Sequence, residues 1–227
     1  MPLRQIVFIG STGGSVLSRI ARHTFVREMA HEAVADRPCA FLDVARRFGI
    51  PAVRLVAADG AEFSDALQQR YFGRDDLIYL SFYTRLFCGD FMARQQGRIF
   101  NCHPSLLPMA PGMRGFEDTL ATDYLFMGCT LHLIDGGIDT GAPVIQAALP
   151  IDRRRPVAHN RHWVFLAQYY TTLQFLLWVR DNRLTFAADG RPAIRDARWQ
   201  PSPFAPNLDA DFSDLLEAVG ETNELVP

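Results

Sequence analysis

The composition of the 227-residue chain is that of an ordinary globular protein, with 48% hydrophobic and 21% charged residues and a formal net charge of −2. A protein without a net positive charge is not expected to attract a polyanion, so we expect neither nucleic acid nor a membrane as a partner. All 23 residues counted as Lys+Arg are arginine, which excludes lysine Schiff-base chemistry and a lysine-dependent phosphate loop. The four cysteines form no C-x-x-C pair and no signal-peptide pattern opens the chain, so we expect free thiols and a cytoplasmic protein.

Short apolar strands alternate with helical stretches in the first part of the chain. A glycine-rich turn at 11–15 follows the first strand and precedes the first helix. The predicted strands are 4–10, 32–35, 52–55, 77–80 and 98–102, and the predicted helices are 16–29, 40–48 and 63–71. This alternation predicts an α/β fold with a doubly wound, mostly parallel central sheet and helices on both faces.

The pattern changes in the last part of the chain. Two longer apolar segments, 127–134 and 143–149, flank a glycine-rich stretch and predict antiparallel or mixed strand pairing. A long aromatic helix over 159–180 is expected to cover a sheet face and to offer a contact face for a homodimer. After Trp199 the chain is rich in proline and acid, so we expect a catalytic domain over 1–199 and an acidic extension over 200–227, with a short helix at 208–219.

An amide, an imidazole and a carboxylate stand at the ends of two predicted strands. Asn101 and His103 end the strand before Pro104, and Asp139 lies in the glycine-rich stretch after the next long strand. Acyl transfer to an amine needs a donor for the developing oxyanion, a group that titrates near neutral pH, and an anion that favours the imidazolium. On the residues alone, a turn-capping asparagine and a satisfied strand-end histidine remain the alternative.

The string Asn-Cys-His-Pro-Ser-Leu-Leu-Pro at 101–108, with His132 and Asp139 seven residues apart, resembles the folate-dependent formyltransferases. The resemblance extends over about 6–178 and is greatest to the glycinamide ribonucleotide formyltransferases of purine synthesis. It implies a Rossmann-like fold, 10-formyltetrahydrofolate as the formyl donor, and no metal. It also implies a small amine acceptor, either phosphorylated or not.

The resemblance assigns roles to three groups of residues. It gives the catalytic roles to Asn101, His103 and Asp139. The folate would contact a donor segment made of Thr84, Arg85, Leu86 and Phe87, and a donor loop made of Asp135, Gly136, Gly137 and Ile138. The turn residues Gly13, Gly14 and Ser15, ahead of a predicted helix, are a candidate cradle for an acceptor phosphate.

The acceptor side departs from the family pattern. Val16 stands where the family has asparagine, Gln168 where it has a glutamate, and Tyr169 where it has a histidine. Glycinamide ribonucleotide is therefore the best single prediction, and an amino sugar or another specialised amine is the alternative. Hydrolysis of 10-formyltetrahydrofolate is an alternative of a different class; those relatives carry a preceding regulatory domain, and the first predicted strand here begins at Arg4.

Other polar residues keep two interpretations. His132 lies either near the folate loop or inside the sheet, and the cluster 152–155 is either a phosphate site or a solvated charge run. The remaining histidines, His23, His31, His159 and His162, are expected on the surface or on helix faces, with no metal-binding spacing. A tRNA substrate would need a basic surface that the acidic tail does not supply.

Overall fold

The structure is a computed structural model that describes residues 4–225. The described chain divides into two compact units. The first contains the residues up to Asn101 together with Leu133–Gly141, and the second contains Cys102–His132 and the residues from Ala142 onward. The division falls inside one strand, between Asn101 and Cys102.

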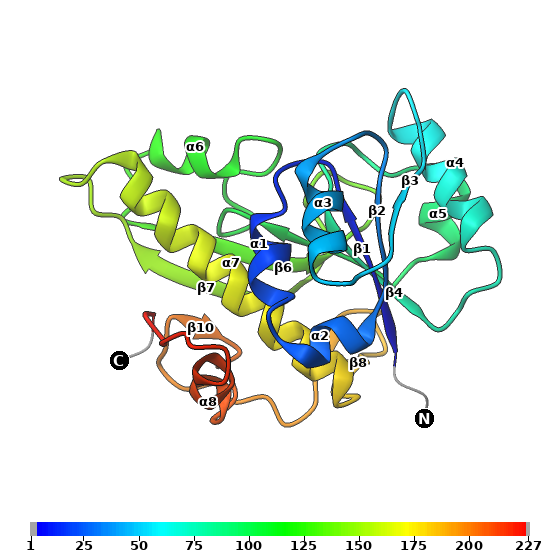
Figure 1. Cartoon of the computed structure of the whole chain (residues 1–227). Coiled ribbons are helices and arrows are strands. Elements are labelled where there is room, and N and C mark those ends of the chain that lie inside the picture. The colour runs from blue at the N-terminus through cyan, green and yellow to red at the C-terminus, as the bar shows by residue number, and fades with distance from the viewer. Residues whose placement is uncertain (1–3, 226–227) are drawn as a thin grey trace. The chain divides into compact units, whose positions relative to one another are not determined.

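The first unit is built on parallel strands that pair in the order β5-β4-β1-β2-β3 (Figure 1). The strands are β1 (Gln5–Gly10), β2 (Ala30–Ala35), β3 (Ala52–Arg54), β4 (Leu77–Phe82) and β5 (Ile99–His103). The helices are α1 (Ser15–Ile20), α2 (Thr24–Met29), α3 (Ala40–Arg47), α4 (Gly60–Arg70) and α5 (Gly89–Arg94). The prediction of an α/β fold with a mostly parallel sheet is confirmed.

Apolar side chains cover both faces of this sheet. Val7 and Ile9 of β1 pack in one buried cluster with residues of α4 and α5. On the other face, the ring of Phe41 in α3 lies so close to Gly10 that a Cβ on Gly10 would overlap the ring. The centroid of the same ring lies 6.2 Å from that of Phe82. Burial on both faces explains why β1 is continuously apolar after Gln5 rather than alternating.

The predicted helix 16–29 is interrupted in the structure, a correction to the sequence analysis. The chain leaves α1 after Ile20, and His23 takes an extended conformation before α2 begins. Arg27 stabilises the break because its Nη1 donates to the carbonyl oxygens of Ala21 and Arg22 at 2.7 and 2.8 Å. His23, expected on the surface, is buried at this break.

The second unit contains the predicted mixed strands. β6 (Phe126–Leu133) pairs antiparallel with β7 (Pro143–Pro150), and β7 pairs antiparallel with β10 (Phe204–Ala205). The other elements are α6 (Gly115–Leu120), α7 (Val157–Arg180), α8 (Phe212–Glu217) and a hairpin of β8 (Leu184–Phe186) with β9 (Pro192–Ile194). The mixed C-terminal part of the fold is confirmed.

Four aromatic residues in the second half of α7 lie inside the folded chain. Tyr169, Tyr170, Phe175 and Trp178 are each 1% exposed or less. These four side chains are not available for a contact with a second copy, whereas Trp163 and Phe165 of the same helix are half-buried. The homodimer stays a prediction.

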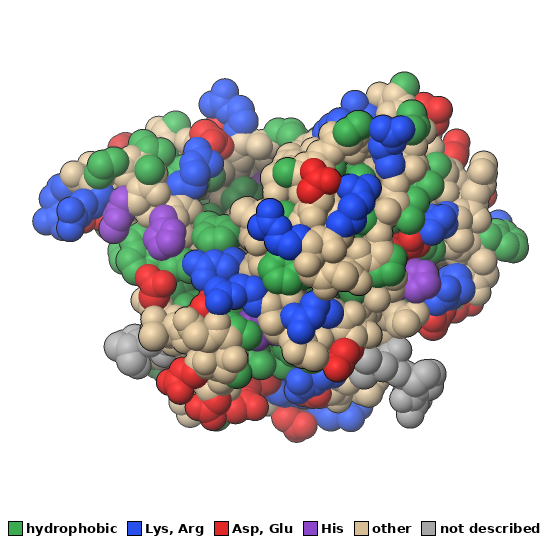
Figure 2. All heavy atoms as spheres, in the orientation of Figure 1, with side chains coloured by type: hydrophobic (Ala, Val, Ile, Leu, Met, Phe, Trp, Pro, Cys, Tyr) green, Lys and Arg blue, Asp and Glu red, His purple; other side chains and the backbone are tan. Residues whose placement is uncertain are grey.

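The segment after Trp199 contributes to the core of the second unit. Phe212 and Leu216 are buried, and the ring of Phe212 meets that of Tyr170 edge-on at 5.4 Å. Asp209 accepts hydrogen bonds from Gln174 and Arg183 at 2.9 and 2.7 Å. Acidic side chains gather on the outside around α8 (Figure 2). The domain boundary at residue 199 stays a prediction.

Phe212→Ala is therefore expected to destabilise the protein by about 3–5 kcal/mol, the usual cost of truncating a buried phenylalanine. Trp199→Ala is the matched control, because this side chain is 71% exposed and its loss should change stability by less than about 0.5 kcal/mol. Urea unfolding of both variants measures the difference. Equal midpoints would show that the tail does not contribute to the fold.

None of the helices within residues 4–225 combines the length and the apolar character needed to cross a membrane. All the cysteines are free thiols; Cys102 and Cys129 are buried, whereas Cys88 is exposed.

Candidate active site

Asn101 and His103 lie at the carboxyl end of β5, as predicted. Asn101 is half-buried and stands in register with Ser81 of the neighbouring strand β4. His103 is the last residue of the strand and is 4% exposed. Ligands of doubly wound sheets bind beyond the carboxyl ends of the strands, so both residues occupy a favoured position for chemistry.

The imidazole of His103 is held by its own surroundings in the second unit. Its Nε2 lies 2.9 Å from the carbonyl oxygen of Ala110, which also accepts a hydrogen bond from Ser105 Oγ at 3.0 Å. Gly115 leaves room for the ring, because a Cβ at that position would overlap Nε2. No sequence signal marked Ala110 or Gly115, since both act through the backbone.

The donor loop is a short, internally bonded turn in the first unit. Asp135 Oδ1 accepts hydrogen bonds from the Gly137 amide at 3.0 Å and from Thr140 Oγ1 at 2.6 Å. The amide of Ile134 donates to the carbonyl of Ile99 at 2.8 Å, which fixes the start of the loop beside β5. Asp139 is half-buried and takes a left-handed conformation with φ of 53°. The middle of the loop, Gly136, Gly137 and Ile138, is exposed.

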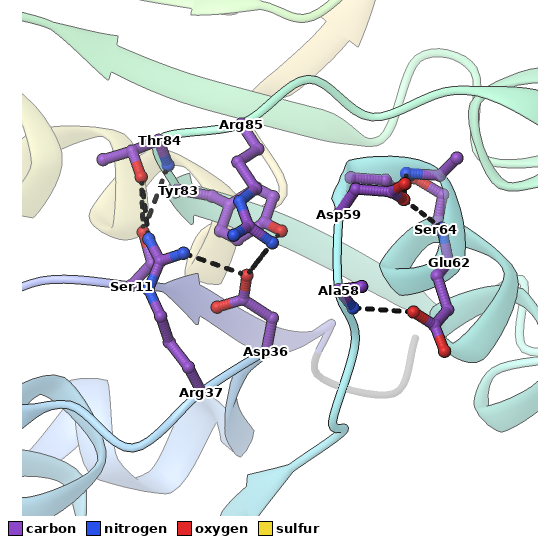
Figure 3. A network of polar contacts seen from close by, with 12 residues as sticks. Ser11, Asp36, Arg37, Ala58, Asp59, Glu62, Ser64, Tyr83, Thr84 and Arg85 are labelled. Atoms are coloured by element: carbon purple, nitrogen blue, oxygen red, sulfur yellow. Dashed lines mark hydrogen bonds and ion pairs between the residues drawn. The ribbon is translucent and has the colours of Figure 1, made fainter.

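The donor segment follows β4 at the same carboxyl edge of the sheet. Ser11 Oγ accepts a hydrogen bond from the Thr84 amide at 3.2 Å and lies 2.9 Å from Thr84 Oγ1 (Figure 3). Leu86 is 62% exposed, and Phe87 stacks on Tyr83 with ring centroids 5.3 Å apart. The segment is therefore anchored at both ends, and Leu86 between them is exposed.

The candidate acceptor turn lies between β1 and α1. Gly14 has a left-handed φ of 72° and is the N-cap of α1, which begins at Ser15. Gly13 and Ser15 are exposed, and a Cβ on Gly13 would meet nothing within 4 Å. Glycine at position 14 is needed because a side chain disfavours this conformation.

Asp36 was not singled out from the sequence, although it directly follows the predicted strand that became β2. Its Oδ2 accepts hydrogen bonds from Tyr83 Oη at 3.0 Å and from Arg85 Nη1 at 2.9 Å, and lies 3.3 Å from Arg37 Nη1 (Figure 3). Burial and the bond to Asp36 raise the pKa of Tyr83, so its hydroxyl remains a donor at neutral pH. A polar residue at the end of a parallel strand is the signal that could have found it.

Several residues that were considered for acceptor binding make defined contacts in the second unit. Gln168 Nε2 donates to the carbonyl of Cys102 at 3.0 Å, whereas Tyr169 is fully buried. Arg153 donates to backbone carbonyls of the 120–124 segment, and Arg154 pairs with Asp152 at 2.9 Å. These arginines are engaged locally, which favours the interpretation of 152–155 as a structural and solvated charge run. His132 is buried in β6.

The first unit thus brings together the donor segment, the donor loop, the glycine-rich turn, Asn101 and Asp139. His103 and Gln168 belong to the second unit. Within residues 4–225 no group of three or more His, Cys, Asp or Glu side chains is arranged to hold a metal ion. The arrangement is that of an α/β protein with the donor segment, the glycine-rich turn and Asn101 at the carboxyl edge of a parallel sheet.

Residues 4–159 match the formyl transferase family, and the chain belongs to that family. The chain is 31% identical over 157 residues to a phosphoribosylglycinamide formyltransferase of Mycobacterium tuberculosis (strain CDC 1551 / Oshkosh), with 66% of this chain and 72% of that protein covered. It is 33% identical over 178 residues to the trifunctional purine biosynthetic protein adenosine-3 of Drosophila melanogaster. That match covers 71% of this chain but spans only 13% of the length of the much longer relative.

Among solved structures, the chain is similar to glycinamide ribonucleotide transformylase 1 from Symbiobacterium toebii. The two share 28% identity with a TM-score of 0.76, and the similarity covers 86% of this chain and 95% of that one. The fold class predicted from the sequence and the family resemblance are therefore both confirmed.

Proposed function

We propose that this chain is a cytoplasmic enzyme that transfers the formyl group of 10-formyltetrahydrofolate to the primary amine of glycinamide ribonucleotide. The observation that carries the proposal is the pair Asn101 and His103 at the end of β5, in a chain 31% identical over 157 residues to a protein named phosphoribosylglycinamide formyltransferase. Residues two apart in a strand face the same side, so this pair suits a shared reaction centre. No metal is part of the proposal.

The proposed reaction is a direct transfer through a tetrahedral intermediate. The acceptor nitrogen bonds to the formyl carbon, and the amide of Asn101 together with the protonated His103 donates hydrogen bonds to the oxyanion. Asp139 favours the imidazolium and helps to order a water that carries protons. The bond from the carbon to N10 then breaks, and the proton lost by the acceptor nitrogen is returned to N10.

The donor is proposed to bind between the donor segment and the donor loop. Leu86 of the donor segment and all four residues of the donor loop are exposed, and hydrogen bonds anchor both stretches within the first unit. The acceptor phosphate is proposed to meet Gly13, Gly14 and Ser15, where glycine keeps the backbone amides accessible.

Another amine acceptor, such as an amino sugar, remains the second candidate. Its support is the set of acceptor-side residues Val16, Gln168 and Tyr169; Gln168 is engaged with the Cys102 carbonyl, and Tyr169 is buried. Hydrolysis, with water as the acceptor, is the third.

An acceptor screen separates these candidates. The protein is mixed with 10-formyltetrahydrofolate and one amine at a time, and release of tetrahydrofolate is followed by absorbance. We expect turnover with glycinamide ribonucleotide and none without an amine. Turnover with only a different amine would remove the purine assignment, and turnover in water alone would favour the hydrolase.

A further inference from the structure

A buried carboxylate directly contacts residues on either side of Thr84, the first residue of the donor segment. The side chain of Asp36 is 0% exposed, and its Oδ2 accepts hydrogen bonds from Tyr83 Oη and Arg85 Nη1 (Figure 3). Asp36 directly follows β2, whereas Tyr83 and Arg85 follow β4. One carboxylate therefore connects residues that are 47 and 49 positions away in the sequence.

We propose that Asp36 is a positioning residue that holds the donor segment in its folate-binding conformation. This inference rests on the proposed function, because it takes that segment to be the folate site. Asp36 acts through Tyr83 and Arg85 and does not itself contact the reacting atoms.

The donor segment depends on side-chain contacts because it is neither helix nor strand. Ser11 Oγ accepts from the Thr84 amide at 3.2 Å, and Ser64 Oγ accepts from the Cys88 amide at 3.1 Å. Between these two anchors, the carbonyl of Leu86 lies against Gly60, where a Cβ would overlap it. Asp36 adds a further anchor by accepting hydrogen bonds from the side chains of Tyr83 and Arg85.

Tyr83 transmits the position of Asp36 to the far end of the segment. Its ring packs between Phe63, at a centroid distance of 4.8 Å, and Phe87, on which it stacks with an interplanar angle of 21°. The carboxylate fixes the hydroxyl end of the ring while the aromatic contacts fix its plane. Phe87 is the last residue of the donor segment. Asp36 therefore acts on the end of the segment through Tyr83, and on its second residue, Arg85, directly.

The charges around Asp36 link the donor segment to the glycine-rich turn. Arg37 and Arg85 are 37% and 34% exposed, and both guanidiniums approach the same Oδ2. Arg37 Nη2 also donates to Thr84 Oγ1 at 3.1 Å, and Thr84 Oγ1 lies 2.9 Å from Oγ of Ser11, the first residue of the turn. Without the carboxylate, the two cations would repel each other and release Arg85 and Thr84.

The contacts of Asp36 with Arg37 and Arg85 are not those expected of an ion pair whose only role is to stabilise the fold. Asp36 Oδ1 is buried without a hydrogen-bond partner among the residues that the structure describes. An unsatisfied buried oxygen lowers stability, and the half-exposed arginines gain little from pairing. A role in fixing the donor segment accounts for the arrangement.

The test compares Asp36→Asn with Asp43→Asn. Asp43 is the matched control, because its exposed carboxylate pairs with the exposed Arg46 on α3, on the opposite face of the sheet from Phe63 and α4. Tetrahydrofolate binding is measured by titration calorimetry without oxygen, and KM for 10-formyltetrahydrofolate and kcat are measured with saturating acceptor. For Asp36→Asn we expect the dissociation constant and KM to rise roughly tenfold or more, with a much smaller change in kcat. Asp43→Asn should match the wild type in each quantity.

Tyr83→Phe is the second variant, since it removes one bond to Asp36 and keeps the aromatic packing. It should shift folate affinity in the same direction by a smaller factor. If Asp36→Asn folds and binds tetrahydrofolate with wild-type affinity, or if it does not fold and Tyr83→Phe binds as the wild type does, the positioning role is wrong. A fall in kcat without a rise in KM would also overturn it. Failure of the wild type to bind tetrahydrofolate would instead refute the proposed function, and the positioning role with it.

Discussion

Replacing His103 by alanine is expected to lower kcat by roughly 10²–10⁴-fold, the usual contribution of a positioned acid-base group. The ring is buried at the end of β5, and its Nε2 is oriented by the Ala110 carbonyl. The proposed transfer needs a proton donor to the oxyanion and a proton carrier between the two nitrogens, and alanine supplies neither. Steady-state kinetics with saturating donor and acceptor measure the loss.

Two further variants separate chemistry from structure at this position. His103→Gln keeps an amide nitrogen that can donate to the Ala110 carbonyl but provides no acid-base group, so it should lose activity as alanine does. His162→Ala is the matched control, because His162 is exposed on α7 and lies outside the proposed site. Near-normal turnover in His103→Gln would contradict an acid-base role for the ring.

Replacing Glu32 by alanine is expected to destabilise the protein by roughly 2–4 kcal/mol, because it leaves a buried polar cluster without its acceptor. Both carboxylate oxygens of Glu32 accept from Arg70, at 2.7 and 2.6 Å, and Tyr71 Oη donates to it at 2.8 Å. This expectation lies below that for a fully buried ion pair, since Arg70 is 37% exposed. The contacts tie the end of α4 to β2. Chemical unfolding measures the loss.

The contribution of Glu32 should also depend on pH. Burial raises the pKa of Glu32, but hydrogen bonds from Arg70 and Tyr71 outweigh that effect and hold the pKa below its ordinary value of 4.5. A carboxyl with a lowered pKa stabilises the fold above its unfolded pKa and loses that contribution as the pH falls through the folded pKa. The stability gap between the wild type and Glu32→Ala should therefore be constant near neutrality and shrink below about pH 4.5.

Glu117→Ala is the matched control for this prediction. Its carboxylate also pairs with an arginine, Arg161, at 2.7 Å, but both partners are about half exposed. Such a pair contributes about 0–1 kcal/mol. If Glu32→Ala were no less stable than Glu117→Ala, the buried cluster would not hold α4 to β2.

The parallel sheet was predictable because its strands are continuous apolar runs separated by turn residues. The break in the first helix was not, since it depends on Arg27 reaching the carbonyls of Ala21 and Arg22. The burial of Phe212 and Leu216 in the acidic tail was not predicted either. Asp209 is satisfied by Gln174 and Arg183, which lie 35 and 26 residues away, and no local pattern signals such a pairing.

The same distinction applies to the candidate site. Asn101 and His103 were identified because they stand together at the end of one strand, in a string typical of a family. Asp36 was missed because its significance lies in contacts with Tyr83 and Arg85, which follow a different strand. Ala110 and Gly115 act through a carbonyl group and through the absence of a side chain, so residue chemistry alone gives no indication of them.

The fate of the formyl carbon tests the central claim most directly. The protein is given 10-formyltetrahydrofolate labelled with ¹³C in the formyl group together with glycinamide ribonucleotide, and the products are followed by NMR and mass spectrometry. We expect the label in an N-formyl group on the amine of the acceptor, formed in step with tetrahydrofolate. Label recovered as free formate, or label left on the donor while the protein binds folate normally, would contradict formyl transfer to this amine.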